Sequence, residues 1–303
     1  MVRTSILTRY LDPEVLSRMA NQRIEARLLV EGNLAGAHKS PRHGFAVEFA
    51  GHREYVPGDD PKHIDWRIYF TRDKYFIKQY EMETNFVCHL VLDVSASMRY
   101  GEEEQQKLQY ASEMAATLGY SVVRQSDKVS FTTFDEGVVD HVPPSNSMGQ
   151  VIHMTQLLDQ IRPVNKTDLG RCLQTLCARF KRREIIMIFS DFFADLDGLE
   201  APLQRMRYDR HEVVLFQVLH HDELEFDLPG MIKFIGLESD DQVLAQSGDL
   251  RRTYLDALAG HNGKLQDICH RNQIEYVQVD TSRDMAEVLS DYLHRRSVLN
   301  RGR

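Results

Sequence analysis

The sequence predicts an α/β protein with a doubly wound, mostly parallel sheet and a small β-containing N-terminal appendage. Two observations support this fold class. From about residue 86 onward, short and almost wholly apolar segments alternate with segments of helical periodicity. Strands covered by helices on both faces are apolar along their whole length, as in parallel sheets. Before residue 86, glycines and prolines divide the chain into short pieces, which indicates a smaller and more irregular unit.

The expected strands of the large unit are its continuous apolar runs. They cover residues 86–93, 127–134, 137–142, 184–191, 211–219 and 274–280, and residues 231–246 are also expected to be β. Only a short turn at Asp135–Gly137 separates the second and third runs, which predicts a hairpin. Between the strands, apolar residues recur every three or four positions and predict helices, at residues 108–122, 151–161, 169–180, 199–206, 249–272 and 283–298.

The segment before residue 86 is expected to form an N-terminal helix followed by the β-containing appendage. The helix is expected at about residues 13–27, and strands at residues 28–30, 45–49 and 69–80. The predicted division of the chain is therefore residues 1–85 for the helix and appendage, and residues 86–298 for the doubly wound domain.

Composition restricts the class of protein and its compartment. Of the 303 residues, 42% are hydrophobic and 27% are charged, as in ordinary globular domains. No apolar run is long enough to cross a bilayer, and the N-terminus lacks the pattern of a signal peptide. Four cysteines stand without CxxC spacing, which favours reduced thiols over disulfides or a zinc site. We therefore expect a cytoplasmic protein without direct membrane insertion.

The charge distribution disfavours nucleic acid as a partner. The net charge is −8, and residues 1–80 carry 13 Lys and Arg against 10 Asp and Glu, so the remainder sums to −11. Phosphate backbones require a basic surface, and the mildly basic first segment lacks clustered cations with interleaved aromatic residues.

Oxygen-bearing side chains follow two of the apolar runs. Residues 90–98 read LVLDVSASM, in which Asp93, Ser95 and Ser97 alternate after a strand, and EIIMIFSD ends at Asp191. A third loop, NKTDLG, supplies Thr167 beside Asp168 just before a helix. Ligands of doubly wound sheets bind at the carboxyl ends of the strands.

These hydroxyl and carboxylate oxygens, with no His or Cys among them, are the ligands that Mg²⁺ or Mn²⁺ prefers. Held mainly by neutral hydroxyls, the ion would retain positive charge and seek a further carboxylate from a partner. The alternative interpretation is that the two serines only cap a helix N-terminus.

This arrangement resembles the metal-ion-dependent adhesion site of von Willebrand factor A domains. The likeness in fold covers about residues 86–298. It implies that the matching positions hold the metal, with the aspartates often acting through water: Asp93, Ser95, Ser97, Thr167 and Asp191. Asp168 is an adjacent candidate for a supporting role.

Residues 28–81 resemble the leader segment of the bacterial family called domain of unknown function 58, chiefly through REYVPGDDPKHIDW at 53–66. Members of that family carry a von Willebrand A-like domain after this segment and accompany MoxR-type AAA+ ATPases. The resemblance implies a chaperone-like role in complex assembly, metal-cofactor insertion or protein maturation. It implies as partners a MoxR-type ATPase and other von Willebrand A-domain proteins.

The same stretch admits two interpretations. It is a candidate docking loop with six polar and aromatic residues, or a structural turn at Pro57–Gly58 in which the tryptophan anchors the appendage. The candidate docking residues are Arg53, Tyr55, Asp59, Asp60, Asp65 and Trp66. A further polar run, His220–Glu223, is expected to be a solvated loop.

Two function classes remain open at this stage. The first is a non-catalytic, metal-dependent protein-interaction module. The alternative is a magnesium-dependent, phosphatase-like hydrolase that uses Asp93 as nucleophile. Aspartyl-phosphate chemistry normally needs a second acid two residues later, where this chain has Ser95. Because the sequence contains no P-loop and no G-x-S-x-G motif, the interaction module is the favoured prediction.

Overall fold

The computed structural model describes residues 6–24, 47–56, 64–72, 74–82, 86–163, 166–181, 183–237 and 242–301. The chain forms two compact units, Met1–Leu28 with Phe86–Arg303, and Leu29–Asn85. The sequence-based division grouped the first helix with the appendage, whereas its contacts place it with the large unit. Tyr10 and Met19 are buried in the core of that unit, and Arg9 pairs with Asp159 at 3.1 Å.

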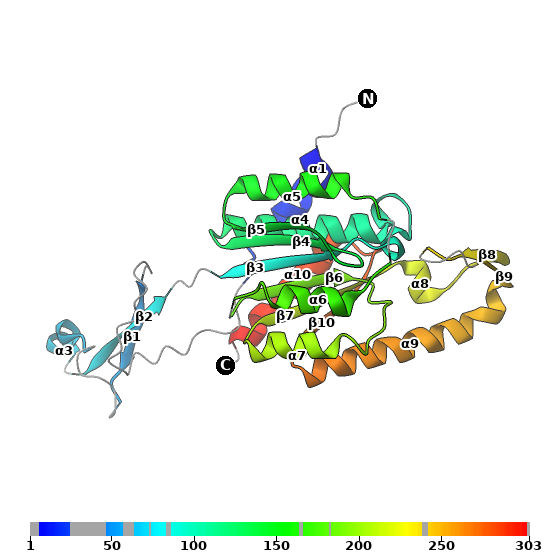
Figure 1. Ribbon diagram of the computed structural model, residues 1–303. Coiled ribbons are helices and arrows are strands. Elements are labelled where there is room, and N and C mark those ends of the chain that lie inside the picture. The colour runs from blue at the N-terminus through cyan, green and yellow to red at the C-terminus, as the bar shows by residue number, and fades with distance from the viewer. Residues whose placement is uncertain are drawn as a thin grey trace. The chain divides into compact units, whose positions relative to one another are not determined.

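The large unit is built on a six-stranded sheet, which Figure 1 shows between layers of helices. The strands are β3 (Val87–Asp93), β4 (Lys128–Phe134), β5 (Val138–Ser145), β6 (Ile185–Ser190), β7 (Glu212–Leu219) and β10 (Glu275–Asp280). Their order is β10-β7-β6-β3-β4-β5. All neighbours are parallel except the β4–β5 hairpin. The predicted doubly wound, mostly parallel sheet is confirmed.

Alternate residues of the central strand β3 enter two separate cores. Leu90 and Leu92 pack in the cluster beneath α1 (Ile6–Tyr10), α4 (Lys107–Arg124), α5 (Met148–Gln160) and α10 (Met285–Arg301). Val91 packs in the opposite cluster with α6 (Leu169–Cys177), α7 (Glu200–Tyr208) and α9 (Ser247–Arg271). All three side chains are fully buried, each contributing about 1.5–3 kcal/mol. This two-sided burial is why the run is apolar at every position.

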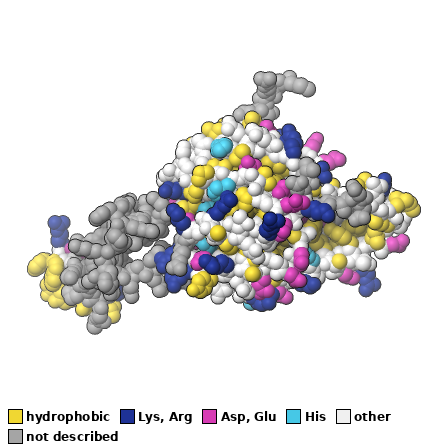
Figure 2. Space-filling view, in the orientation of Figure 1, with side chains coloured by type: hydrophobic (Ala, Val, Ile, Leu, Met, Phe, Trp, Pro, Cys, Tyr) yellow, Lys and Arg dark blue, Asp and Glu magenta, His cyan; other side chains and the backbone are white. Residues whose placement is uncertain are grey.

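A hairpin lies between β7 and α9. It follows α8 (His221–Glu225) and consists of β8 (Met231–Ile235) and β9 (Gln242–Gln246). Phe226 stacks on Phe234 of the hairpin at 5.8 Å and on Tyr254 of α9 at 4.6 Å. Met231 and Leu244 stay 67% and 66% exposed, and Figure 2 shows the hydrophobic side chains that gather at this end. The stacked rings thus hold one face of the hairpin while apolar residues of the other face remain in solvent.

The helix expected at residues 13–27 is shorter and is preceded by another. The structure has α1 and then α2 (Pro13–Arg18). Asp12 caps α2 by accepting a hydrogen bond from the Glu14 N–H at 2.8 Å, and Pro13 occupies the first helical position, where its missing N–H costs nothing.

No described helix is both long and apolar enough to cross a membrane.

The small unit contains a strand pair and a helix. β1 (Val47–Glu54) pairs antiparallel with β2 (Phe76–Met82), with an irregularity between Phe49 and Gly51. The strand expected over residues 69–80 is wrong in its first part, because α3 (Trp66–Arg72) is helical. The Asp65 side chain accepts a hydrogen bond from the Arg67 N–H at 3.0 Å and so helps begin this helix. The expected strand at residues 28–30 lies outside the described residues.

Glu113, on the face of α4 toward α1, gives a prediction for pH-dependent stability. Burial is the main cause that raises its pKa to about 7. Since the unfolded chain ionises this group near its ordinary value, ionisation above pH 7 destabilises the folded state, and this destabilisation disappears as the pH falls toward 4.5. We expect Glu113→Gln to raise the free energy of unfolding by about 1–3 kcal/mol at pH 8.5 and to have little effect at pH 4.5. Urea unfolding at both pH values measures this, and an equal effect at both would contradict it.

Candidate metal site at the carboxyl edge of the sheet

The candidate site lies where the order of strands reverses. From β3 the chain continues outward to β4 and β5, then returns to β6 on the other side of β3 and continues to β7 and β10. Asp93 is the last residue of β3, and Asp191 directly follows β6. In doubly wound folds this point leaves a crevice at the carboxyl ends of the strands. The topology therefore brings together two aspartates that are 98 positions apart in sequence.

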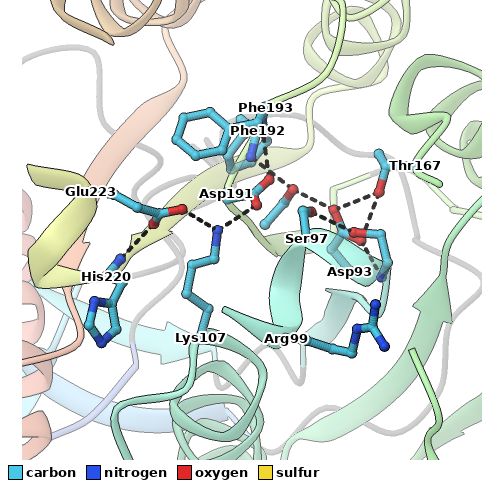
Figure 3. A network of polar contacts seen from close by, with 12 residues as sticks. Asp93, Ser97, Arg99, Lys107, Thr167, Asp191, Phe192, Phe193, His220 and Glu223 are labelled. Carbon is cyan, nitrogen blue, oxygen red and sulfur yellow. Dashed lines mark hydrogen bonds and ion pairs between the residues drawn. The ribbon is translucent and has the colours of Figure 1, made fainter. Parts of the chain in front are cut away.

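Asp93 is fully buried, and hydrogen bonds reach both of its carboxylate oxygens. Oδ1 accepts from the Ser95 N–H at 2.9 Å and from Thr167 Oγ1 at 3.0 Å. Oδ2 accepts from Ser190 Oγ at 2.6 Å and lies 3.2 Å from Thr167 Oγ1. The loop after β3, the last residue of β6 and the loop that supplies Thr167 thus converge on one carboxylate, and Figure 3 shows Thr167 directed at Asp93.

The two serines of the motif face each other. Ser95 Oγ and Ser97 Oγ are 3.0 Å apart. Ser95 precedes a short 3₁₀ turn, η2 (Ala96–Arg99), and its side chain makes no capping bond to that turn. A second 3₁₀ turn, η3 (Glu103–Gln105), leads into α4. The interpretation of these serines as helix caps therefore has no support in the geometry.

Asp191 lies in an ion network with two residues that the sequence did not suggest. Lys107, at the start of α4, donates to Asp191 Oδ2 at 2.8 Å and to Glu223 Oε1 at 2.9 Å. The other oxygen of Asp191 accepts from the Phe193 N–H at 3.0 Å. The second oxygen of Glu223 accepts from the His220 N–H at 2.8 Å. Figure 3 shows Lys107 between the two carboxylates.

The electrostatics of the site are unbalanced. Burial, reinforced by the charge of Asp191, raises the pKa of Asp93 to about 6. Burial alone would lower the pKa of Lys107, but the carboxylates of Asp191 and Glu223 outweigh it and raise that pKa. In the described part of the chain, no Lys, Arg or His lies within ion-pair distance of Asp93. Asp93 is therefore a buried carboxylate with no described counter-charge in contact, and its ionised form is costly in this position.

The donor set fits a hard divalent cation. All candidate ligands are oxygens, from the hydroxyls of Ser95, Ser97 and Thr167 and the carboxylates of Asp93 and Asp191. Adjacent oxygens around octahedral Mg²⁺ are separated by about 2.9 Å. The Ser95–Ser97 and Thr167–Asp93 oxygen pairs, which are hydrogen-bonded at 3.0 Å, are already as close together as two neighbouring ligands would have to be. Among the residues that the structure describes, no group of three or more His, Cys, Asp or Glu side chains is arranged for a metal, so such a site depends on hydroxyls.

The other candidate residues lie elsewhere or have structural contacts. Asp168 is exposed and caps α6 by accepting from the Arg171 N–H at 3.0 Å. In the small unit, Asp65 is buried and lies 3.0 Å from His52 Nε2. Trp66 is 53% exposed, and its ring meets two tyrosines edge-on.

The remaining candidate docking residues differ in exposure. Arg53 is exposed on β1, and Tyr55 is half-buried beside Tyr75. Asp59 and Asp60 lie outside the described residues. The docking role of this stretch stays a prediction.

Sequence reasoning missed Lys107, Ser190 and Glu223. A signal for Lys107 was present, because it shares a helical face with the buried residues Ala111 and Met114, where a lysine is unusual. The expectation that His220–Glu223 is a solvated loop is wrong. Most of this run forms α8, and the Glu223 side chain is only 12% exposed. Its contact with Lys107 is non-local and leaves no periodic trace in the sequence.

Comparisons with known proteins found relatives in sequence and in structure. Uncharacterized protein Rv1480 of Mycobacterium tuberculosis (strain ATCC 25618 / H37Rv) is 22% identical over 292 residues, covering 94% of this chain and 91% of the relative.

Among solved structures, the conserved hypothetical protein BatB from Bacteroides thetaiotaomicron has a TM-score of 0.47 at 16% identity, covering 70% of this chain and 98% of BatB. The SpRpn10 VWA domain has a TM-score of 0.38 at 9% identity, covering 69% and 95%. The strand order of this chain, with its antiparallel hairpin at one edge, is that of a doubly wound α/β sheet. The model of the family described as "Protein of unknown function DUF58" matches residues 51–264, and the chain belongs to this family.

Proposed function

We propose that this protein is a metal-dependent protein-interaction module. In this proposal Asp93, Ser95, Ser97, Thr167 and Asp191 hold Mg²⁺ or Mn²⁺ at the carboxyl edge of the sheet. The bound ion captures an acidic side chain of a partner protein. The observation that carries the proposal is Asp93, a fully buried carboxylate without a described cation beside it, which accepts hydrogen bonds from the Thr167 and Ser190 hydroxyls and from the Ser95 N–H.

The residues of the chain contribute separately to this function. Ser190 and the Ser95 N–H hold the Asp93 carboxylate in one orientation before the ion binds. Because the hydroxyls of Ser95 and Ser97 are neutral, they leave positive charge on the ion for a partner carboxylate. Ser97 is only half-buried and marks the side from which a partner approaches.

The hydrolase alternative is less well supported. Aspartyl-phosphate chemistry with Asp93 as the nucleophile normally needs a second acid two residues later. The position two residues later is Ser95, which is buried and lies against Ser97 rather than presenting an acid.

The partner class follows from the family resemblance. We propose a MoxR-type AAA+ ATPase, with a role in complex assembly or protein maturation. Purified ATPase from the same organism is tested for binding to the immobilised protein with Mg²⁺, with EDTA, and with Asp93→Ala. We expect binding only with Mg²⁺ and intact Asp93.

Asp267→Ala is the matched control, because Asp267 is an exposed aspartate of α9 outside the site; it should bind as the natural protein does. Equal binding under all conditions would contradict the metal-bridged mechanism. Residues 53–66 would then be the candidate docking segment to test next.

A further inference from the structure

Lys107, the first residue of α4, is unusual because it is a lysine whose side chain is almost completely buried. Its side chain is 1% exposed, and lysine is almost never this buried unless it is paired. The ammonium contacts two carboxylates, and the rings of Tyr100 and Phe193 lie 5.9 and 5.1 Å from it. These contacts exclude water from the ammonium, so its charge acts on Asp191 with little screening.

The charges of the site can be counted from these contacts. Asp93, Asp191 and Glu223 contribute three negative charges and Lys107 one positive charge, which leaves −2. A divalent cation brings this group to zero. Without Lys107 the same group would carry −3, and the ion would leave it at −1. The lysine thus decides whether the loaded site is neutral or repels an incoming anion.

We propose that Lys107 is a built-in counter-cation that sets the charge of the candidate site, so that the site loaded with a divalent ion is neutral and accepts a partner carboxylate. This inference rests on the proposed function and adds a positioning residue that touches neither the ion nor the partner. Lys107 lowers the affinity for the ion, because it competes for Asp191, and raises the affinity of the loaded site for an anion.

Two substitutions change this charge in opposite directions. Lys107→Met keeps an unbranched side chain of similar length and shifts the group to −3. We expect Mn²⁺ to bind about tenfold more tightly and acetate to bind the Mn²⁺-loaded protein about tenfold more weakly. Glu223→Gln shifts the group to −1, and we expect the reverse of both changes. A purely structural role of the network predicts instead that both variants weaken both affinities.

The measurement is water-proton relaxation enhancement with Mn²⁺. The enhancement reports binding of the ion, and its decrease on adding acetate reports the water that acetate displaces from the ion. The probes are Mn²⁺ alone and then acetate at constant ionic strength. Lys128→Met, which removes an exposed lysine at the start of β4, is the control and should match the natural protein. If Lys107→Met fails to fold, Glu223→Gln still tests the dependence of both affinities on the net charge of the site, with a charge change of opposite sign.

The outcomes separate this inference from the proposed function. Opposite-signed changes in the two affinities support the counter-cation role. If the natural protein binds Mn²⁺ through Asp93 but the two affinities do not change in opposite directions, this inference is wrong and the metal site stands. If neither the natural protein nor the variants bind Mn²⁺, both proposals are overturned.

Discussion

Replacing Asp93 by alanine is expected to abolish the binding of Mg²⁺ and Mn²⁺. The substitution removes the charge that attracts the ion and the acceptor that orients Ser190 and Thr167. We expect the dissociation constant to rise at least about 100-fold, because the loss of a charged ligand and its hydrogen bonds exceeds about 3 kcal/mol. Isothermal titration calorimetry with Mg²⁺ measures this directly.

Thermal unfolding gives an independent readout. At 100 times the dissociation constant, an ion that binds only the folded state stabilises it by about 2.7 kcal/mol. For a domain of this size that corresponds to about 5–10 °C in the melting temperature. The natural protein should show this shift with Mg²⁺, and Asp93→Ala should show none.

Asp93→Asn refines the test, because asparagine keeps an acceptor for the Ser95 N–H but lacks the charge. It should retain the fold and lose the shift, whereas the control Asp267→Ala should keep it. If Mg²⁺ raises the melting temperature of Asp93→Ala as much as that of the natural protein, the assignment of Asp93 as a ligand is wrong.

Replacing Arg296 by methionine is expected to lower the free energy of unfolding more than any other substitution proposed for this protein. Arg296 lies on α10, is 1% exposed, and pairs with Glu212 of β7. Its other guanidinium nitrogen lies 3.6 Å from Glu275 of β10. One cation therefore compensates two carboxylates at the amino ends of adjacent strands. Removing one partner of a buried ion pair typically costs about 3–5 kcal/mol, and we expect a loss of this size in urea unfolding.

Two companion variants make this prediction specific. Arg295→Met removes the exposed neighbouring arginine of the same helix and should change stability by less than about 0.5 kcal/mol. The double variant Arg296→Met, Glu212→Gln should recover part of the loss, since it also removes the buried carboxylate left without its cation. A loss below about 1 kcal/mol for Arg296→Met, or no recovery in the double variant, would show that this ion pair does not stabilise the fold as described.

The sheet could be predicted because its signal is local. Each strand is an apolar run of the length that a buried strand requires, and β3 is apolar because both of its faces pack in cores. The positions of Asp93 and Asp191 could be predicted from the same apolar runs. Each aspartate stands where such a run ends, and parallel strands have their carboxyl ends at one edge of the sheet.

The rest depends on contacts that a linear pattern does not record. Lys107 and Glu223 are 116 positions apart, and their pairing arises only when α8 lies near the start of α4. In the small unit, Trp66–Arg72 was expected to be partly strand because its aromatic and β-branched residues favour strands. Tyr69 instead stacks on Tyr75 of the adjoining segment at 4.6 Å, so tertiary packing overrides that preference.

A crystal structure of the protein grown with Mn²⁺, with data collected at the manganese absorption edge, tests the central claim most directly. The account predicts one strong anomalous peak beside the hydroxyls of Ser95, Ser97 and Thr167, and loss of that peak in Asp93→Ala. No peak at this edge of the sheet, or a peak that persists in the variant, would contradict it.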